Sequence, residues 1–287
     1  MSDTSVPDPK KPVSTLSLRE MKRAGLPIVV ITAYDAPSAR MVEEAGADIV
    51  LVGDSLGMVV LGRDSTLPVT VEEMLHHTKA VRKGASRALV VADMPFMSYQ
   101  VTPEEAMRNA GRMMAEGGAQ AVKIEGGLAV AGTVRRLTEA GIPVMGHVGL
   151  TPQSVHQLGG YRVQGKDIES ALKLVEDCLA LQDAGAFAIV LECIPEQLSA
   201  IVSQKLAIPT IGIGAGAGCD GQVQVFHDIL GLGGQSPPRH AKQYVNLSAT
   251  ITHALRTFTG EVRDHAFPGK EHSTQLDPEV LAELKRA

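Results

Sequence analysis

The sequence predicts an α/β protein in which strands and helices close into a (β/α)8 barrel. Short apolar runs alternate with helix-period segments over about 200 residues, enough for roughly eight βα units. The runs are continuously apolar, as strands buried on both faces of a parallel sheet require. Polar residues end nearly every run, which favours loops around one site at the mouth of a barrel. A doubly wound open sheet would explain the first four units equally well, but it would gather such residues at one switch point.

The expected strands are the apolar runs at residues 27–35, 48–55, 88–96, 121–127, 143–150, 188–195, 209–216 and, with the weakest pattern, 222–231. The expected helices lie between them at residues 36–47, 69–84, 102–118, 127–141, 166–185 and 195–206. Thr102 is placed to cap the third of these helices, with Pro103 at its first position. Glycines that follow alanine at 46, 141 and 185 are expected to end helices in the left-handed conformation.

The bulk properties exclude several classes of protein. The net charge is −5 and only 3% of residues are aromatic, with no tryptophan, which argues against nucleic acid as a partner. No apolar stretch approaches the ~18 residues of a membrane span, and no signal peptide is recognisable at the N-terminus. The three cysteines are widely spaced without a CxxC pair, as in a reduced cytoplasmic protein. We expect a flexible tail at residues 1–15, one barrel domain at 16–260 and a C-terminal extension at 261–287.

Side chains able to do chemistry follow five consecutive strands. They are Asp54 and Ser55 after the second strand, Asp93 after the third, Lys123 and Glu125 at the fourth, His147 at the fifth and Glu192 at the sixth. Because Lys123 and Glu125 are two residues apart on a strand, both should face inward, with Val122 and Ile124 facing the helices. A lone acid after a strand is more often a cap, and a lone lysine a solvated rim residue. The interpretation therefore depends on the joint pattern.

The acidic residues of this set predict a divalent metal site. Crowded carboxylates repel one another and raise one another's pKa unless a cation joins them. Mg²⁺ accepts two or three carboxylates together with water and substrate oxygens, whereas zinc requires His or Cys neighbours that are missing at ligand spacing. Asp54 and Asp93 are the expected Mg²⁺ ligands, with Glu125 in the metal shell or beside it.

A glycine-rich segment, GIGAGAGCDG at residues 212–221, could indicate a phosphate-binding loop. Its glycine spacing does not give GxGxxG, and no strand–helix unit with a ribose-binding acid follows. We expect close backbone packing near the site instead.

Several longer motifs carry a resemblance to a known family. They are VGDSLGM (52–58), ADMPFMSYQ (92–100), VKIEGG (122–127), GHVGLTPQSVHQLGGYRVQG (146–165), LECIP (191–195), TIGIGAGAGCDGQVQVFHDILG (210–231) and FPGKEHS (267–273). In this order they resemble ketopantoate hydroxymethyltransferases over nearly the whole chain. Two positions differ from the family pattern, the segment GAGAGCDG and Lys270. Neither includes the proposed acids or Lys123.

The resemblance implies a barrel of the phosphoenolpyruvate/pyruvate type and a cytoplasmic homodecamer. The implied reaction transfers a hydroxymethyl group from 5,10-methylenetetrahydrofolate to 3-methyl-2-oxobutanoate, giving 2-dehydropantoate for pantothenate synthesis. By matching motif, Asp54 and Asp93 would bind Mg²⁺, and Glu125 would complete or buttress its shell. Ser55, Asp93 and Lys123 would contact the keto acid, and Glu192 would accept its proton.

The expected mechanism is an enolate stabilised by Mg²⁺, because chelation by a carboxylate and a ketone oxygen polarises the ketone. Ser55 would orient the substrate carboxylate, Lys123 would add positive charge, and His147 would hydrogen-bond the substrate or a water of the metal shell. Three alternatives remain open: a lyase or mutase of another 2-keto acid that needs no folate, a Schiff base on Lys123, and a scaffold whose acids form only an ion network.

Overall fold

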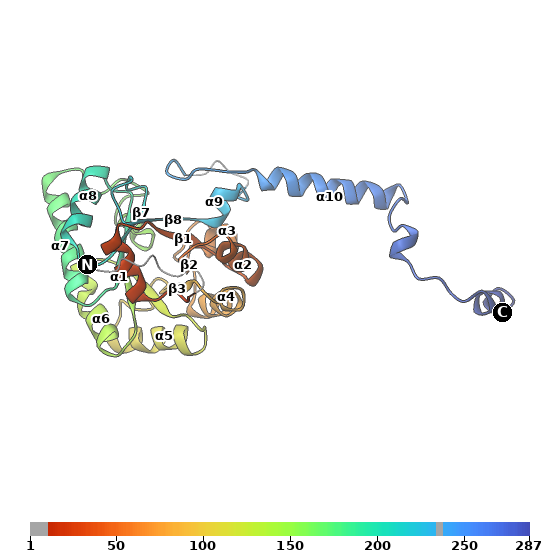
Figure 1. Cartoon of the computed structure of the whole chain (residues 1–287), viewed down its shortest axis with the longest axis horizontal. Helices are drawn as coiled ribbons and strands as arrows, with labels where there is room; N and C mark the ends of the chain where they lie inside the picture. The colour runs from red at the N-terminus through yellow and green to blue at the C-terminus, as the bar shows by residue number, and fades with distance from the viewer. Residues whose placement is uncertain (1–10, 234–237) are drawn as a thin grey trace.

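The computed structural model describes residues 11–233 and 238–287, and within them eight parallel strands form a closed barrel (Figure 1). The strands are β1 (Ile28–Thr32), β2 (Ile49–Val52), β3 (Leu89–Asp93), β4 (Ala121–Glu125), β5 (Val144–Gly149), β6 (Ala188–Glu192), β7 (Thr210–Ile213) and β8 (Gly221–Gln224). They pair in chain order, and β8 pairs with β1 to close the ring. The predicted barrel is confirmed, and an open doubly wound sheet is excluded.

The helices pack mainly outside the barrel, between successive strands (Figure 1). They are α1 (Thr15–Ala24), α2 (Ala36–Glu44), α3 (Leu56–Val59), α4 (Val71–Gly84), α5 (Pro103–Ala115), α6 (Leu128–Glu139), α7 (Ile168–Asp183), α8 (Glu196–Lys205), α9 (Phe226–Leu230), α10 (Leu247–Arg263) and α11 (Pro278–Leu284). Two short 3-10 turns, η1 (Pro152–Ser154) and η2 (Lys270–His272), complete the described structure. No described helix has both the length and the apolar character needed to cross a bilayer.

The first seven strands lie inside the predicted apolar runs, and the six predicted helices are all present. The last run, 222–231, is wrong in its second half. Its first residues belong to β8, but Phe226 to Leu230 form the helix α9, which ends at Gly231 in the left-handed conformation (φ 64°). A short apolar run does not by itself distinguish a strand from a buried turn of helix.

Local capping follows the sequence. The Thr102 side chain accepts a hydrogen bond from the backbone N–H of Glu105 at 3.1 Å, as expected for the N-cap of α5. Gly46, Gly141 and Gly185 have φ values of 91°, 85° and 95°, so each glycine ends its helix in a conformation that a side chain would strain.

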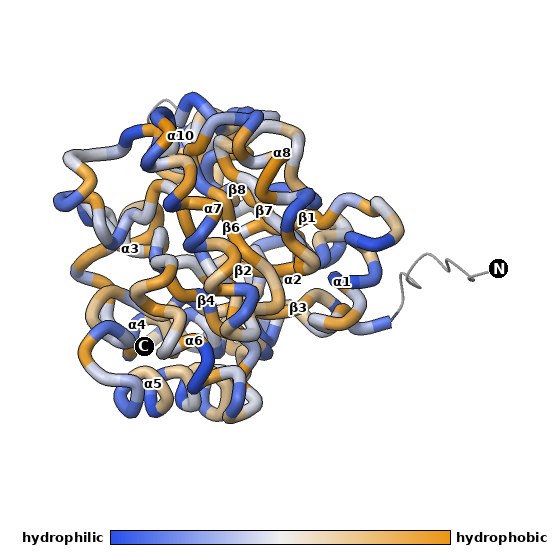
Figure 2. Tube along the Cα trace, turned by 90° about the vertical axis from the view of Figure 1, so that its left-hand side faces the viewer, coloured by the Kyte–Doolittle hydropathy of each residue, from blue (hydrophilic) through white to orange (hydrophobic). Residues whose placement is uncertain are grey.

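The hydrophobic core has two parts, visible as apolar strands at the centre of the molecule (Figure 2). One part fills the barrel, and α1 closes the end where the strands begin, with Leu18 and Met21. The other part lies between the strands and the surrounding helices and contains Val122 and Ile124, as predicted for the outward side of β4. Apolar residues therefore fill the interior of the barrel, and polar side chains lie at the mouth formed by the carboxyl ends of the strands.

Both ends of the described chain have ordered structure near the predicted domain boundaries at residues 15 and 260. Residues 1–10 of the predicted tail lie outside the described residues, and Val13 is already buried, with its N–H donating to the Arg87 carbonyl at 2.8 Å. At the other end α10 leads away from the barrel (Figure 1), and none of its residues is buried. The predicted boundary at residue 260 falls inside this helix.

Glu43, at the end of α2, accepts hydrogen bonds from the backbone of the segment before β3. Its carboxylate accepts hydrogen bonds from the backbone N–H groups of Ser86, Arg87 and Ala88 at 2.6–3.0 Å. Burial opposes the charged form, but these bonds outweigh it and lower the pKa of Glu43. Hydrogen bonds to a charged acceptor contribute about 1–3 kcal/mol.

We expect Glu43→Gln to lower the free energy of unfolding at pH 7 by about 1–2 kcal/mol, because one charged acceptor is lost. A lowered folded-state pKa stabilises the fold above the ordinary carboxyl range, and this gain disappears as the pH falls through the lowered value. The difference from wild type in urea unfolding should therefore shrink below about pH 4. Glu44→Gln is the matched control, because Glu44 is exposed and accepts no hydrogen bond from the described residues. An equal loss in both variants would contradict the expectation.

Candidate functional site

A cavity of about 810 Å³ opens at the carboxyl ends of the barrel strands. Its lining includes every predicted site residue: Asp54, Ser55, Asp93, Lys123, Glu125, His147 and Glu192. Apolar side chains such as Leu51, Val190 and Ile213 close the cavity from below. Residues separated by up to 138 positions are thus brought to one mouth, because all of them lie at or near the carboxyl ends of parallel strands.

Asp93 connects the second strand to the fourth. Its Oδ2 accepts the backbone N–H of Asp54 at 3.0 Å, and its Oδ1 lies 2.9 Å from Lys123 Nζ. All three side chains are almost fully buried. The lysine charge is therefore held close to two carboxylates at the cavity wall.

His147 stands between two further acids. Its Nδ1 lies 3.3 Å from Glu125 Oε1, and its Nε2 lies 3.1 Å from Glu192 Oε2. Burial disfavours the charged imidazole, and so does Lys123, but the two carboxylates outweigh both and raise the pKa of His147 to about 9. The two carboxylates therefore favour the protonated form of His147, whose Nδ1 also lies 3.3 Å from Lys123 Nζ.

The site carries an excess of negative charge. Four carboxylates face two cationic side chains, Lys123 and His147. Burial, followed by the charges of Asp93 and Glu125, raises the pKa of Asp54 to about 8. Burial lowers the pKa of Lys123, but the surrounding acids raise it above its usual value overall. Lys123 therefore stays protonated. The raised pKa of Asp54 favours its protonated acid, which a bound cation would convert to the carboxylate.

The donor chemistry fits Mg²⁺ at Asp54 and Asp93. Asp93 Oδ2 accepts the backbone N–H of Asp54 at 3.0 Å, and the charge of Asp93 helps burial to raise the pKa of Asp54, as expected for two neighbouring acids that a cation could join. Within the described residues no three His, Cys, Asp or Glu side chains are gathered to hold a metal by themselves. Glu125, predicted to lie in the metal shell or beside it, is paired with His147. Mg²⁺ commonly takes one or two carboxylates and completes its shell with water and substrate.

Ser55 is oriented by a residue that the sequence reasoning missed. The Tyr34 hydroxyl lies 2.9 Å from Ser55 Oγ, and the Tyr34 carbonyl lies 2.6 Å from His77 Nδ1. Gln153 and Tyr99 were missed as well, although both stand inside the quoted motifs. Gln153 donates from Nε2 to Asp54 Oδ2 at 2.9 Å and from its backbone N–H to Glu125 Oε2 at 2.9 Å.

Close backbone packing positions Glu192. Gly149 has φ 95°, and a Cβ built there would lie 2.2 Å from the Glu192 carbonyl oxygen. This approach lets the Leu150 N–H donate to the same oxygen at 2.8 Å. The expectation of close packing in the glycine-rich segment is confirmed, because a Cβ at Gly216 would meet Glu196 at 2.4 Å and one at Gly218 would meet Ala200 at 2.7 Å.

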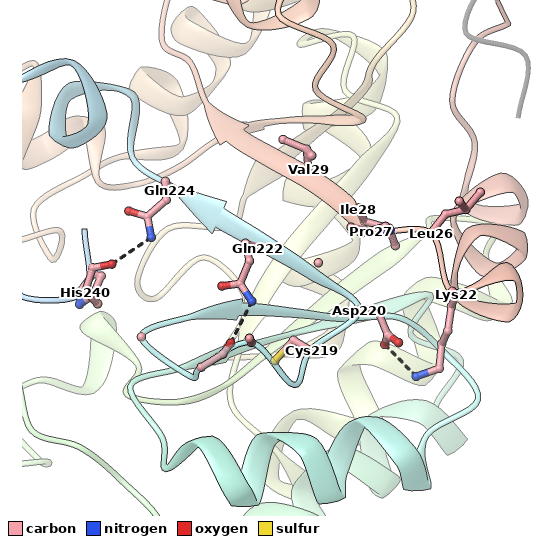
Figure 3. A pocket seen from close by; sticks show the side chains of 15 residues that line it. Lys22, Leu26, Pro27, Ile28, Val29, Cys219, Asp220, Gln222, Gln224 and His240 are labelled. Carbon is pink, nitrogen blue, oxygen red and sulfur yellow. Dashed lines mark hydrogen bonds and ion pairs between the residues drawn. The ribbon is translucent and has the colours of Figure 1, made fainter. Parts of the chain in front are cut away.

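A second hollow, of about 800 Å³, lies outside the barrel beside β1 and β8 (Figure 3). No long helix separates β7 from β8, so Val29 and Gln222 on the outer wall remain exposed. The Lys22–Asp220 ion pair at its edge, 2.8 Å long, satisfies the charged groups there. This hollow contains none of the predicted site residues, so the mouth of the barrel is the candidate active site.

Comparison with known proteins gives a consistent result. The family model for ketopantoate hydroxymethyltransferase matches residues 12–270. A 3-methyl-2-oxobutanoate hydroxymethyltransferase of Carboxydothermus hydrogenoformans is 59% identical over 95% of this chain and 99% of its own. One from Geobacillus sp. (strain WCH70) is 56% identical over 91% of this chain and 93% of its own.

Solved structures of the same fold are more distant in sequence. A phosphonopyruvate hydrolase in complex with oxalate and Mg²⁺ aligns with a TM-score of 0.59 at 13% identity, over 91% of this chain and 93% of that one. A 2,3-dimethylmalate lyase, described as a PEP mutase/isocitrate lyase superfamily member, aligns with a TM-score of 0.56 at 20% identity, over 94% of each chain. These similarities show the same barrel fold.

Proposed function

This chain belongs to the ketopantoate hydroxymethyltransferase family and is an enzyme, and we propose that it transfers a hydroxymethyl group from 5,10-methylenetetrahydrofolate to 3-methyl-2-oxobutanoate, giving 2-dehydropantoate. In the balanced reaction C3 of the keto acid loses a proton and bonds to the methylene carbon. Water supplies the hydroxyl oxygen, and two carrier nitrogens leave as N–H groups. The observation that carries the proposal is one cavity that holds Lys123 and Glu192 beside Asp54 and Asp93.

Binding of the keto acid is assigned to the polar wall of the cavity. Ser55, whose hydroxyl is held by Tyr34, orients the substrate carboxylate. Lys123 places a permanent positive charge beside Asp93, where negative charge develops on the ketone oxygen. A divalent cation at Asp54 and Asp93 would polarise that ketone further, and a phosphonopyruvate hydrolase of the same fold has been solved in complex with oxalate and Mg²⁺.

Proton removal from C3 is assigned to Glu192. Its carboxylate lines the cavity beside Val190, and the imidazolium of His147 lies against one of its oxygens. His147 thus orients Glu192 through Nε2, while Glu125 holds the other ring nitrogen. A base fixed in this way needs only to lie within hydrogen-bond reach of the proton that it removes.

A Schiff base on Lys123 is the weaker alternative. The reaction requires a neutral amine, whereas the acids around Lys123 raise its pKa and keep it protonated. A folate-independent lyase or mutase would share the barrel and its acids, and the assay below distinguishes the two.

The decisive experiment is turnover of 3-methyl-2-oxobutanoate with methylenetetrahydrofolate and Mg²⁺, followed by formation of 2-dehydropantoate. We expect product only when all three are present, with loss on addition of EDTA and recovery on addition of Mg²⁺. Product formed without folate, or turnover unaffected by EDTA, would overturn the proposal.

We propose, from the family resemblance, that the protein is a cytoplasmic homo-oligomer of ten copies. Free cysteines at 178, 193 and 219 agree with a reducing compartment. The exposed apolar residues Ile251, Leu255, Phe258 and Val262 lie on one face of α10, and helices in proteins owe most of their stability to packing of such a face. Contact with a second copy would cover that face.

We expect Leu255→Asp combined with Phe258→Asp to shift the protein to a smaller species in size-exclusion chromatography with light scattering. The new carboxylates would lie on the apolar face of α10, and burying them in a contact between subunits would cost free energy. His253→Asp, on the opposite face, should leave the assembly intact. A monomeric wild type, or an equal shift in both variants, would contradict the assembly.

A further inference from the structure

We propose that Gln153, supported by Tyr99, is a positioning residue that fixes the Asp54 and Glu125 carboxylates for binding of the metal and the keto acid. The inference rests on the proposed function, because it assigns a purpose to the orientation of Asp54. Gln153 lies in η1, directly after β5, and its side chain reaches across the mouth of the barrel.

The side-chain amide of Gln153 uses all of its hydrogen-bonding capacity. Nε2 donates to Asp54 Oδ2 at 2.9 Å and to the Met94 carbonyl at 3.0 Å. Oε1 accepts from the Tyr99 hydroxyl at 2.8 Å and from Gln100 Nε2 at 3.3 Å. An amide offers two donors and two acceptor positions, so none is left over.

These partners permit only one orientation of the amide. A rotation that exchanged Oε1 and Nε2 would bring an oxygen against the Met94 carbonyl, which only accepts, and against Asp54 Oδ2, which only accepts once a bound cation holds Asp54 as the carboxylate. Gln153 and Tyr99 are both almost fully buried, so water could not compensate. The donor aimed at Asp54 is therefore locked.

The same residue also holds the fourth strand. The backbone N–H of Gln153 donates to Glu125 Oε2 at 2.9 Å, opposite the side of Glu125 that His147 contacts through Oε1. The Tyr99 hydroxyl oxygen lies 3.2 Å from the Glu125 N–H and 3.0 Å from its carbonyl. One glutamine and one tyrosine thus tie the ends of β2 and β4 to the loop after β3.

Such support matters for a metal site with only two protein carboxylates. The hydrogen bond from Gln153 restrains Asp54 through Oδ2 and leaves Oδ1 available to a cation. Residues that hold ligands in this way typically account for 10–100-fold in metal affinity. Gln153 touches neither the substrate nor the reacting atoms in this assignment, so its effect should appear in binding rather than in chemistry.

The test is calorimetric titration of Mg²⁺ into the full-length Gln153→Met variant, alongside keto-acid KM and C3 proton exchange. Met keeps the length of the side chain but removes both donors and both acceptors. We expect the Mg²⁺ dissociation constant to rise roughly 10–100-fold and the KM to rise with it. The exchange rate at saturating metal and keto acid should stay within a few-fold of wild type.

Two further variants make the result specific. Tyr99→Phe keeps the buried ring but frees the amide, so it should weaken Mg²⁺ binding in the same direction by a smaller factor, and it decides the matter if Gln153→Met does not fold. Gln120→Met is the control, because the Gln120 side chain accepts from the Val90 N–H at the opposite end of the barrel. Unchanged Mg²⁺ affinity in folded Gln153→Met or Tyr99→Phe, or an equal loss in Gln120→Met, would overturn the inference. A wild type that binds no Mg²⁺ would instead refute the proposed function beneath it.

Discussion

Glu192→Gln is expected to abolish exchange of the C3 proton of 3-methyl-2-oxobutanoate while binding of the keto acid survives. Gln keeps the shape of the side chain and an oxygen facing His147 Nε2, but an amide cannot accept a proton at neutral pH. General-base catalysis typically contributes 10²–10⁴-fold, so we expect a loss of roughly that size. Proton NMR in D₂O, with Mg²⁺ and without folate, measures the exchange directly.

The control for this experiment is Glu196→Gln, four residues further on and exposed at the start of α8. It should exchange the C3 proton at the wild-type rate. A Glu192→Gln enzyme that exchanges as fast as wild type would remove Glu192 as the base. Loss of keto-acid affinity in calorimetry, with exchange at saturation preserved, would instead make Glu192 a binding residue.

The strand-end residues could be predicted because one local rule places them. A strand buried on both faces is continuously apolar, so the first polar side chain marks its end, and parallel strands bring their ends together. Asp54, Asp93, His147 and Glu192 were all found in this way and line one cavity. The period-two alternation also placed Lys123 on the inner side.

The residues that hold these side chains follow no such rule. Gln153 stands in η1 and Tyr99 in a loop, where the backbone has no repeating period to indicate direction. Their partners lie 99 and 54 positions away, at Asp54 and Gln153, so only the closed barrel shows the connection. The pairing of Glu125 with His147 depends instead on the register of β4 against β5, which sets the two residues side by side and which the apolar pattern does not fix.

The second large effect is expected for the two aspartates: Asp54→Asn and Asp93→Asn should each weaken Mg²⁺ and keto-acid binding together. Each removes one of the two carboxylates proposed to hold the metal, and the keto acid is expected to bind through that metal. An amide oxygen is a neutral and poorer ligand for a hard cation. We expect Mg²⁺ dissociation constants to rise at least ~10²-fold, beyond the 10–100-fold effect of a supporting residue. Calorimetry that finds wild-type Mg²⁺ affinity in both variants would refute the ligand pair.

We expect Asp54→Asn and Asp93→Asn to change the melting temperature of the metal-free protein in opposite directions. Asp54 has a pKa of about 8, well above its unfolded value, so its negative charge destabilises the folded state increasingly as the pH rises toward 8. Asp54→Asn removes that charge, and in EDTA at pH 8 its melting temperature should exceed that of wild type, by roughly 2–4 °C for each kcal/mol recovered. Asp93→Asn instead takes from buried Lys123 the carboxylate 2.9 Å away, so the same measurement should show a decrease. Equal shifts in both variants would mean that Asp54 does not carry the surplus negative charge that a divalent cation would neutralise.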